Sequence, residues 1–214
     1  MTGPRLSVTG RRWLSALAAI FAILMVNPVL AHHQKPNDGP IRGVAIPAIS
    51  HGDMQVIARY RSWILDLAAR QPVTDPTLRR LAGFISLQRF ACFWGLVPGS
   101  ISDEQSPFNE CSHAYLAGTR TLLAHMAGMP GDQSAAKEVE ARIAAEIASD
   151  PAAHAMCSNS DQTFDSADVI GPDWRLAPLH TPTVLTFAAL ALLVVMSLVV
   201  TVRRWRHRAV TAAS

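Results

Sequence analysis

Histidine, methionine and cysteine are the side chains of this chain that could bind a transition metal. Seven of the eight histidines lie between residues 32 and 180, together with four methionines and all three cysteines. Imidazole suits copper, zinc or nickel, and thioether or thiolate sulfur suits cuprous copper. No pair follows a metal-binding spacing such as Cys-x-x-Cys or His-Glu-x-x-His. For any single cluster, core packing is therefore the more common explanation, because flexible methionine often fills helical cores.

The region after the first apolar segment gives the sharpest metal hypothesis. If a signal peptide is cleaved after Ala31, His32 becomes the first residue, with a free α-amine beside its own imidazole. These two nitrogens can chelate one ion, and copper(II) is the divalent first-row ion that nitrogen ligands hold most tightly. The hypothesis is a copper site at His32 and His33, which His51 and Met54 would complete if the arm folds back. The alternative is that these histidines have no ligand role.

Other catalytic and metal-binding patterns are absent or incomplete. Glu110 and His113 form one Glu-x-x-His unit, whereas di-iron bundles use two, and the apolar stripe of this segment is expected to turn both residues towards solvent. Asp161, Asp165 and Asp168 lack the glycine and closing glutamate of a calcium loop, so a solvated acidic linker is expected. No Gly-x-Ser-x-Gly or haem-attachment motif occurs. We therefore expect no enzymatic activity. An enzyme with an unfamiliar active site stays open as a third class of function.

The spacing of the cysteines predicts one disulfide. Cys92 and Cys111 lie at equal distances from the middle of a turn at 98–105, and residues equidistant from a hairpin turn lie level. We therefore expect a Cys92–Cys111 bond, the alternative being two buried free thiols. Cys157 is then left over. It could stay free, bind metal with His154, or bridge a homodimer.

Two apolar segments determine where the chain lies relative to a membrane. Residues 183–202 carry no charge or proline and, at about 20 residues, can cross a bilayer as a helix. Arginines follow at 203, 204, 206 and 208, which favours a cytoplasmic C-terminus. Residues 1–31 have a basic start, a short apolar run and a small-residue ending, as a cleaved signal peptide does. An uncleaved anchor is the alternative, which Pro28 disfavours.

The charge of the outer part differs from that of the whole chain. Twelve of the 19 basic residues and all 16 acidic residues lie between residues 32 and 180, which gives this part a net charge of −4. The overall charge of +3 therefore comes from the two ends. A mildly acidic domain without a basic stripe argues against nucleic-acid binding.

Between these ends the sequence predicts helices and no strand. An extended arm at 32–49 precedes a helical domain at 50–157, and a polar linker at 158–182 leads to the membrane helix and a basic tail at 203–214. The expected helices run from Ser50 to Arg70, from Pro76 to about Val97, from Ser106 to Gly128 and from Ser134 to Ser149. Their apolar residues recur at helical spacing. We expect an all-α fold, an extracytoplasmic antiparallel bundle of about four helices plus one transmembrane helix.

These features together favour an anchored protein with an outer helical domain. We expect a single-pass protein of a bacterial inner membrane, with its domain in the periplasm and its C-terminus in the cytoplasm. The expected role is accessory or interactive, beside another envelope protein, because most of the sequence serves packing and anchoring. The alternative is a periplasmic metal-handling protein, with copper as the expected metal.

Overall fold

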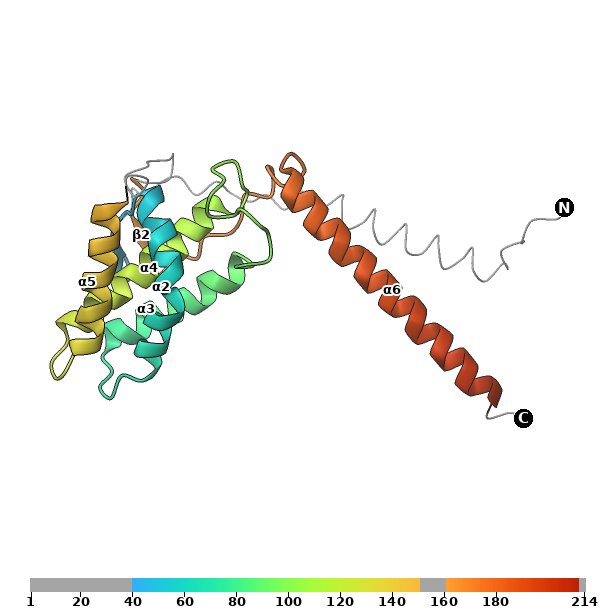
Figure 1. Ribbon diagram of the computed structural model, residues 1–214, viewed down its shortest axis with the longest axis horizontal. Helices are drawn as coiled ribbons and strands as arrows, with labels where there is room; N and C mark the ends of the chain where they lie inside the picture. Colours follow the sequence, from blue (N-terminus) through green and yellow to red (C-terminus); the bar gives the residue numbers. More distant parts are fainter. Residues whose placement is uncertain (1–39, 151–160, 212–214) are drawn as a thin grey trace. The chain divides into compact units, whose positions relative to one another are not determined.

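The computed structural model describes residues 40–150 and 161–211, and over these ranges the chain is mostly helical (Figure 1). Its elements are β1 (Ala45–Ile46), α2 (His51–Ala69), α3 (Pro76–Ala91), α4 (Asn109–Gly128), α5 (Ser134–Ser149), β2 (Phe164–Asp165) and α6 (Thr181–Thr211). This confirms the helical class and the C-terminal apolar helix. The expected signal peptide at 1–31, His32, His33, His154 and Cys157 lie outside the described residues.

Local capping signals explain where α2 and α3 begin. Ser50 and Asp53 form a reciprocal capping box, in which the Asp53 amide donates to Ser50 Oγ over 2.9 Å. Asp75 accepts from the Leu78 amide over 2.7 Å, and Pro76 occupies the first turn. Both starts agree with the sequence analysis.

The end of α3 and the start of α4 differ from the positions expected from the sequence. Helix α3 stops at Ala91 instead of near Val97, since Phe93 has φ 47° and Gly95 has φ 82°, which a right-handed helix cannot contain. Helix α4 begins at Asn109 instead of Ser106. The Ser106 hydroxyl accepts from the Phe108 amide over 3.3 Å, so it stabilises the turn before the helix.

Helix α4 lies at the centre of the helical domain and contacts α2, α3, α5 and β1 (Figure 1). Thirteen of its 20 residues are buried, so it has no single apolar stripe. Gly118 allows α4 to pack tightly against α3, since a Cβ at this position would lie only 2.9 Å from the Phe84 ring. The expectation that Glu110 and His113 face solvent is therefore wrong for His113, which is completely buried.

The arm and the expected linker meet on the surface of this domain. Ala45 and Ile46 of β1 pair antiparallel with Asp165 and Phe164 of β2. Ile46 and Phe164 are both buried in the main core. The sequence analysis expected no strand, because each strand has only two residues and shows no visible alternation of apolar and polar positions. The partner strand is also far away in the chain.

Asp165 holds the arm in place. Its carboxylate accepts the amides of Arg42 (2.7 Å), Gly43 (2.9 Å) and Ala167 (2.9 Å), and only 2% of the residue is exposed. Burial alone would raise the pKa of Asp165, but these backbone hydrogen bonds outweigh it and hold the pKa below the ordinary value. The expectation of a solvated acidic linker is therefore wrong at Asp165.

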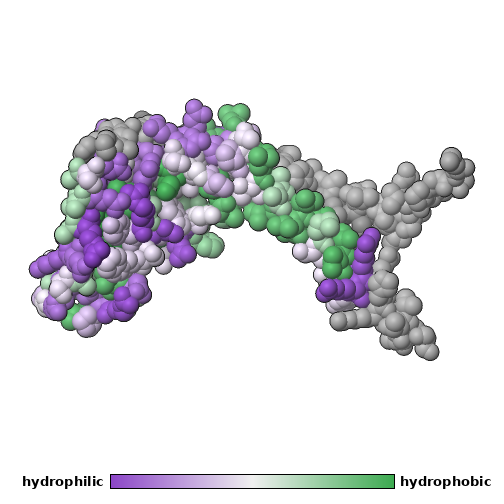
Figure 2. All heavy atoms as spheres, viewed as in Figure 1, coloured by the Kyte–Doolittle hydropathy of each residue, from purple (hydrophilic) through white to green (hydrophobic). Residues whose placement is uncertain are grey.

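Helix α6 includes the described segment that could cross a membrane. Thr181–Trp205 is 25 residues long and strongly apolar, and almost none of it is buried by the rest of the chain. Figure 2 shows hydrophobic residues along this helix, followed by hydrophilic ones towards its C-terminal end. At 1.5 Å per residue such a helix spans a hydrocarbon core of about 30 Å.

Candidate functional site

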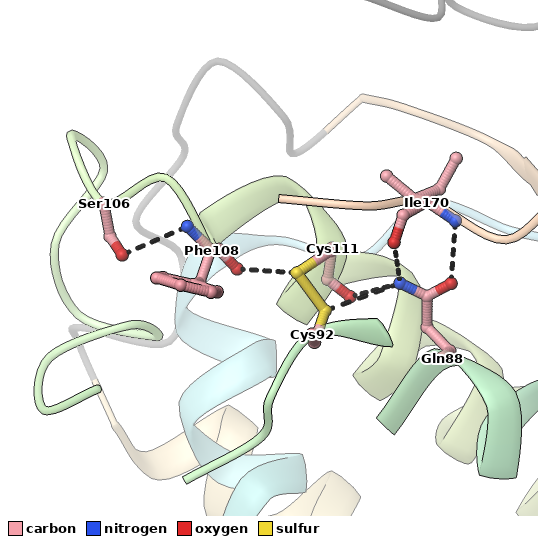
Figure 3. Close-up of a disulfide and its surroundings, with 6 residues drawn as sticks. All are labelled: Gln88, Cys92, Ser106, Phe108, Cys111 and Ile170. Carbon is pink, nitrogen blue, oxygen red and sulfur yellow. Dashed lines mark hydrogen bonds between the residues drawn. A yellow bond between two sulfur atoms is a disulfide. The ribbon is translucent and has the colours of Figure 1, made fainter. Parts of the chain in front are cut away.

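The end of α3 and the start of α4 form one buried junction (Figure 3). Cys92 and Cys111 form the expected disulfide, with their Cα atoms 5.7 Å apart. The Gln88 side chain lies beside it, and its Nε2 donates to Cys92 Sγ (3.5 Å), to the Cys111 carbonyl (3.1 Å) and to the Ile170 carbonyl (2.7 Å). Gln88 Oε1 accepts the Ile170 amide over 2.9 Å. One buried glutamine therefore joins the helix hairpin to the segment that precedes α6.

Aromatic rings continue from this junction to helix α6. The Trp174 ring lies 6.0 Å from Phe93, 5.8 Å from Phe108 and 6.1 Å from Phe187 of α6, measured between centroids. The contacts with Phe93 and Phe108 are edge-to-face, the arrangement that aromatic quadrupoles favour. Phe187 also packs against the apolar cluster that contains the disulfide.

A polar contact fixes the first turn of α6. His180 is buried, and its Nε2 lies 3.0 Å from Asp103 Oδ2 while its Nδ1 lies 2.7 Å from Thr183 Oγ1. The Asp173 amide also donates to the Pro107 carbonyl over 2.8 Å. The described part of the expected linker thus packs on the helical domain from Phe164 to the start of α6.

A second polar feature lies inside the domain. The rings of His51 in α2 and His113 in α4 are 5.8 Å apart between centroids, and both residues are buried. Burial, and to a lesser degree the neighbouring His51, lowers the pKa of His113 to about 4. The imidazole of His113 is therefore neutral at pH 7, the form in which histidine binds metals.

Of the four expected copper ligands, the structure describes two. His51 and Met54 are both buried and lie three residues apart on α2, on one face of the helix. His32 and His33 lie outside the described residues. Over 40–150 and 161–211 no group of three or more histidine, cysteine or acidic residues is close enough to hold a metal ion.

Next to the disulfide junction the surface has a shallow apolar hollow. It has a volume of about 500 Å³ and is lined by Ser86, Arg89, Phe90, Phe93, Trp94 and Leu96. No catalytic arrangement of nucleophile and base occurs among these residues. Comparison of the chain with known proteins finds no matching family model, no matching curated protein and no matching solved structure.

Sequence reasoning missed three residues of this junction. Gln88 is recognisable only as a polar residue within an apolar helix, while Trp174 and His180 lie in a segment that reads as a linker. Their roles depend on residues far away in the chain. A buried amide in an apolar helix was the one available signal, because a buried polar group requires a partner.

Proposed function

We propose that this chain is a membrane-anchored interaction protein, with its helical domain outside the cytoplasm and held close to the bilayer. The domain would act as an antiparallel bundle that offers its outer face to another envelope protein. The observation that carries the proposal is the junction of Gln88, Ile170, Trp174 and Phe187, which attaches the segment before α6, and α6 itself, to the described domain. A domain fixed in this way presents the same face to neighbours in the membrane.

A surface for such a partner lies on α2 and α5. The guanidinium of Arg142 lies 5.5 Å from the centre of the Trp63 ring, and Trp63 stacks on Tyr60 at 6.5 Å. Trp63 is partly exposed. Tryptophan, tyrosine and arginine are the residues most enriched among binding hot spots, which supports this face as the contact.

Site-specific photocrosslinking in cells tests the interaction. A crosslinking residue at Trp63 should give a defined adduct with one other membrane or periplasmic protein, whereas one at Val73, in the loop before α3, should not. If neither Trp63 nor any other exposed position on α2, α3 and α5 gives an adduct, the interaction role is wrong. A reporter active only outside the cytoplasm, fused after Ser214, tests the orientation; activity there would reverse it.

Copper handling is the second candidate, and the His51–His113 pair favours it. Two buried imidazoles, 5.8 Å apart between ring centroids, are suited to cuprous copper. Met54 supplies a thioether on the same helix face as His51. His32 and His33 would supply a separate copper(II) site at a free N-terminus. The two sites would take different oxidation states of one metal.

Copper titration of the mature chain distinguishes these sites. A chain with one extra N-terminal residue should lose copper(II) affinity if the free amine of His32 is a ligand. His51→Phe should lose copper(I) affinity if the buried pair is the site, and His125→Phe serves as the matched control. If the unmodified chain binds neither ion more tightly than micromolar, the copper proposal fails.

A further inference from the structure

A group of large apolar side chains is exposed beside the start of α6. Phe90 and Leu179 are each 81% exposed, and Leu87, Phe93 and Trp174 are also exposed. We call these five residues the membrane-proximal surface. They come from the end of α3, the turn after it and the segment that leads into α6. Soluble proteins rarely leave such groups together without a contact for them.

Contacts between aromatic rings connect part of this surface to α6. Phe90 and Phe93 line the same hollow, Phe93 contacts Trp174, and Trp174 contacts Phe187 within α6. Beyond its first turns, the apolar exterior of α6 is almost uncovered by the rest of the described chain. A bilayer that covers α6 therefore reaches the neighbouring aromatic residues as well.

The backbone at Phe93 supports a contact at this position. Its φ of 47° lies in the left-handed region, which is unfavourable for a residue with a large side chain. Strained positions of this kind tend to occur where a side chain is held for function. Here the strain keeps an aromatic ring half exposed beside Trp174.

The chemistry of the surface fits a phospholipid interface. Tryptophan and other amphipathic aromatic residues concentrate at the level of lipid headgroups. Arg89 lines the hollow with Phe90, and Arg175 follows Trp174; both are exposed. A guanidinium can bind a lipid phosphate through two hydrogen bonds while the adjacent ring enters the acyl boundary.

We propose that the membrane-proximal surface lies in the outer leaflet of the bilayer that α6 crosses, so that the helical domain rests on the lipid. This proposal rests on α6 as a membrane span, the anchoring part of the proposed function, and not on the identity of any protein partner. It also assigns the α3 end of the domain to lipid and leaves α2 and α5 for a protein.

Fluorescence quenching by lipids tests this assignment. The full chain carrying Cys157→Ser, which leaves the disulfide intact, receives one labelling cysteine by Ser86→Cys or Val73→Cys. Ser86 lines the hollow, whereas Val73 is an exposed apolar residue before the other end of α3, about 15 Å away along the helix. Each chain is labelled with a small fluorophore and placed, one copy per disc, in phosphatidylcholine–phosphatidylglycerol nanodiscs that contain a nitroxide lipid.

We expect severalfold stronger quenching at residue 86 than at residue 73. The double change Phe90→Glu and Leu179→Glu should reduce quenching at residue 86 to the level at residue 73, because carboxylates stay in water. Equal quenching at both positions, or no effect of the double change, would overturn the proposal. So would quenching that occurs only with several copies per disc, since a second copy would then cover the surface.

A separate measurement keeps this result distinct from the proposed function. If the chain resists alkaline extraction from membranes but residue 86 is not quenched, the anchor stands and the lipid contact is wrong. If the chain is extracted as a soluble protein, the anchor itself fails, and the proposed function fails with it.

Discussion

Gln88 and Ile170 lie 82 positions apart and are joined by two hydrogen bonds, of 2.7 Å and 2.9 Å. The glutamine side chain pairs with both the carbonyl and the amide of Ile170, as a neighbouring strand would. Gln88 is completely buried and Ile170 is half-buried, so these bonds are partly shielded from water, which makes an unmade bond costly. They attach the segment before α6 to the end of α3.

Replacement of Gln88 should loosen that attachment. Gln88→Met keeps the length of the side chain but leaves backbone groups of half-buried Ile170 and of buried Cys111 without this partner. We expect a loss of about 2–4 kcal/mol in the free energy of unfolding, and faster amide exchange at Ile170. Gln105→Met, at an exposed position, is the control and should change neither. Urea unfolding together with hydrogen exchange measures both effects; unchanged exchange at Ile170 would contradict the role of Gln88.

The disulfide should be present in protein isolated without reductant. Mass spectrometry should find Cys92 and Cys111 linked in one peptide pair, and three free thiols would show the assignment to be wrong. The bond closes a loop with a sequence separation of 19. In the chain-entropy model such a loop contributes roughly 3 kcal/mol, so the double change to alanine should lower the urea midpoint by a corresponding amount.

The buried His113 makes stability depend on pH. Its folded pKa of about 4 lies below the ordinary 6.5, so between these values the unfolded chain binds the proton more readily. Stability should therefore rise from pH 4 to pH 6.5 and level off above, by up to about 3 kcal/mol. His113→Gln should flatten this rise, whereas His125→Gln, at a half-buried site, should keep it. Urea unfolding across this range measures the slope, and an unchanged slope in His113→Gln would contradict the assignment.

Two glycine substitutions should have opposite effects. A Cβ at Gly43 would lie 2.5 Å from both Asp165 Oδ1 and Ser166 Oγ, so Gly43→Ala should displace the arm and lower stability. A Cβ at Gly83, inside α3, meets nothing within 4 Å. Gly83→Ala should raise stability by about 0.5–1 kcal/mol, because alanine restricts the unfolded chain and favours the helix. Thermal unfolding measures both, and a stabilising Gly43→Ala would show that Asp165 does not hold the arm as described.

A charge in the middle of α6 should prevent insertion. Leu193 is at the centre of Thr181–Trp205, where an arginine costs about 2.5–3.5 kcal/mol on insertion scales. Leu193→Arg should therefore increase the fraction of chain released by alkaline extraction. Val202→Arg, next to Arg203, is the matched control and should remain in the membrane, since arginine near a helix end can reach the interface. Equal release of both variants would argue against a span.

Local signals in the sequence were sufficient for the main elements. Ser50 and Asp75 mark the starts of α2 and α3 because a cap depends on residues three positions away. The apolar run of α6 is visible for the same reason, since its length and composition are properties of one segment. The Cys92–Cys111 pairing was expected from a turn at 98–105. The observed connection is longer, 92–108, but it still brings the end of α3 beside the start of α4.

Only the tertiary structure decided the junction and the buried polar groups. His113 was expected to face solvent because one stripe was assigned to its helix, but α4 is surrounded by neighbours on several sides. In the sequence Asp165 resembles a linker residue, but in the fold its carboxylate accepts the amides of Arg42 and Gly43. Gln88 has a role only because Ile170 comes to it from a distant part of the chain. The sequence around a polar side chain does not show whether that side chain is exposed or buried. Burial requires hydrogen-bond partners, and these come from parts of the chain that only the fold brings together.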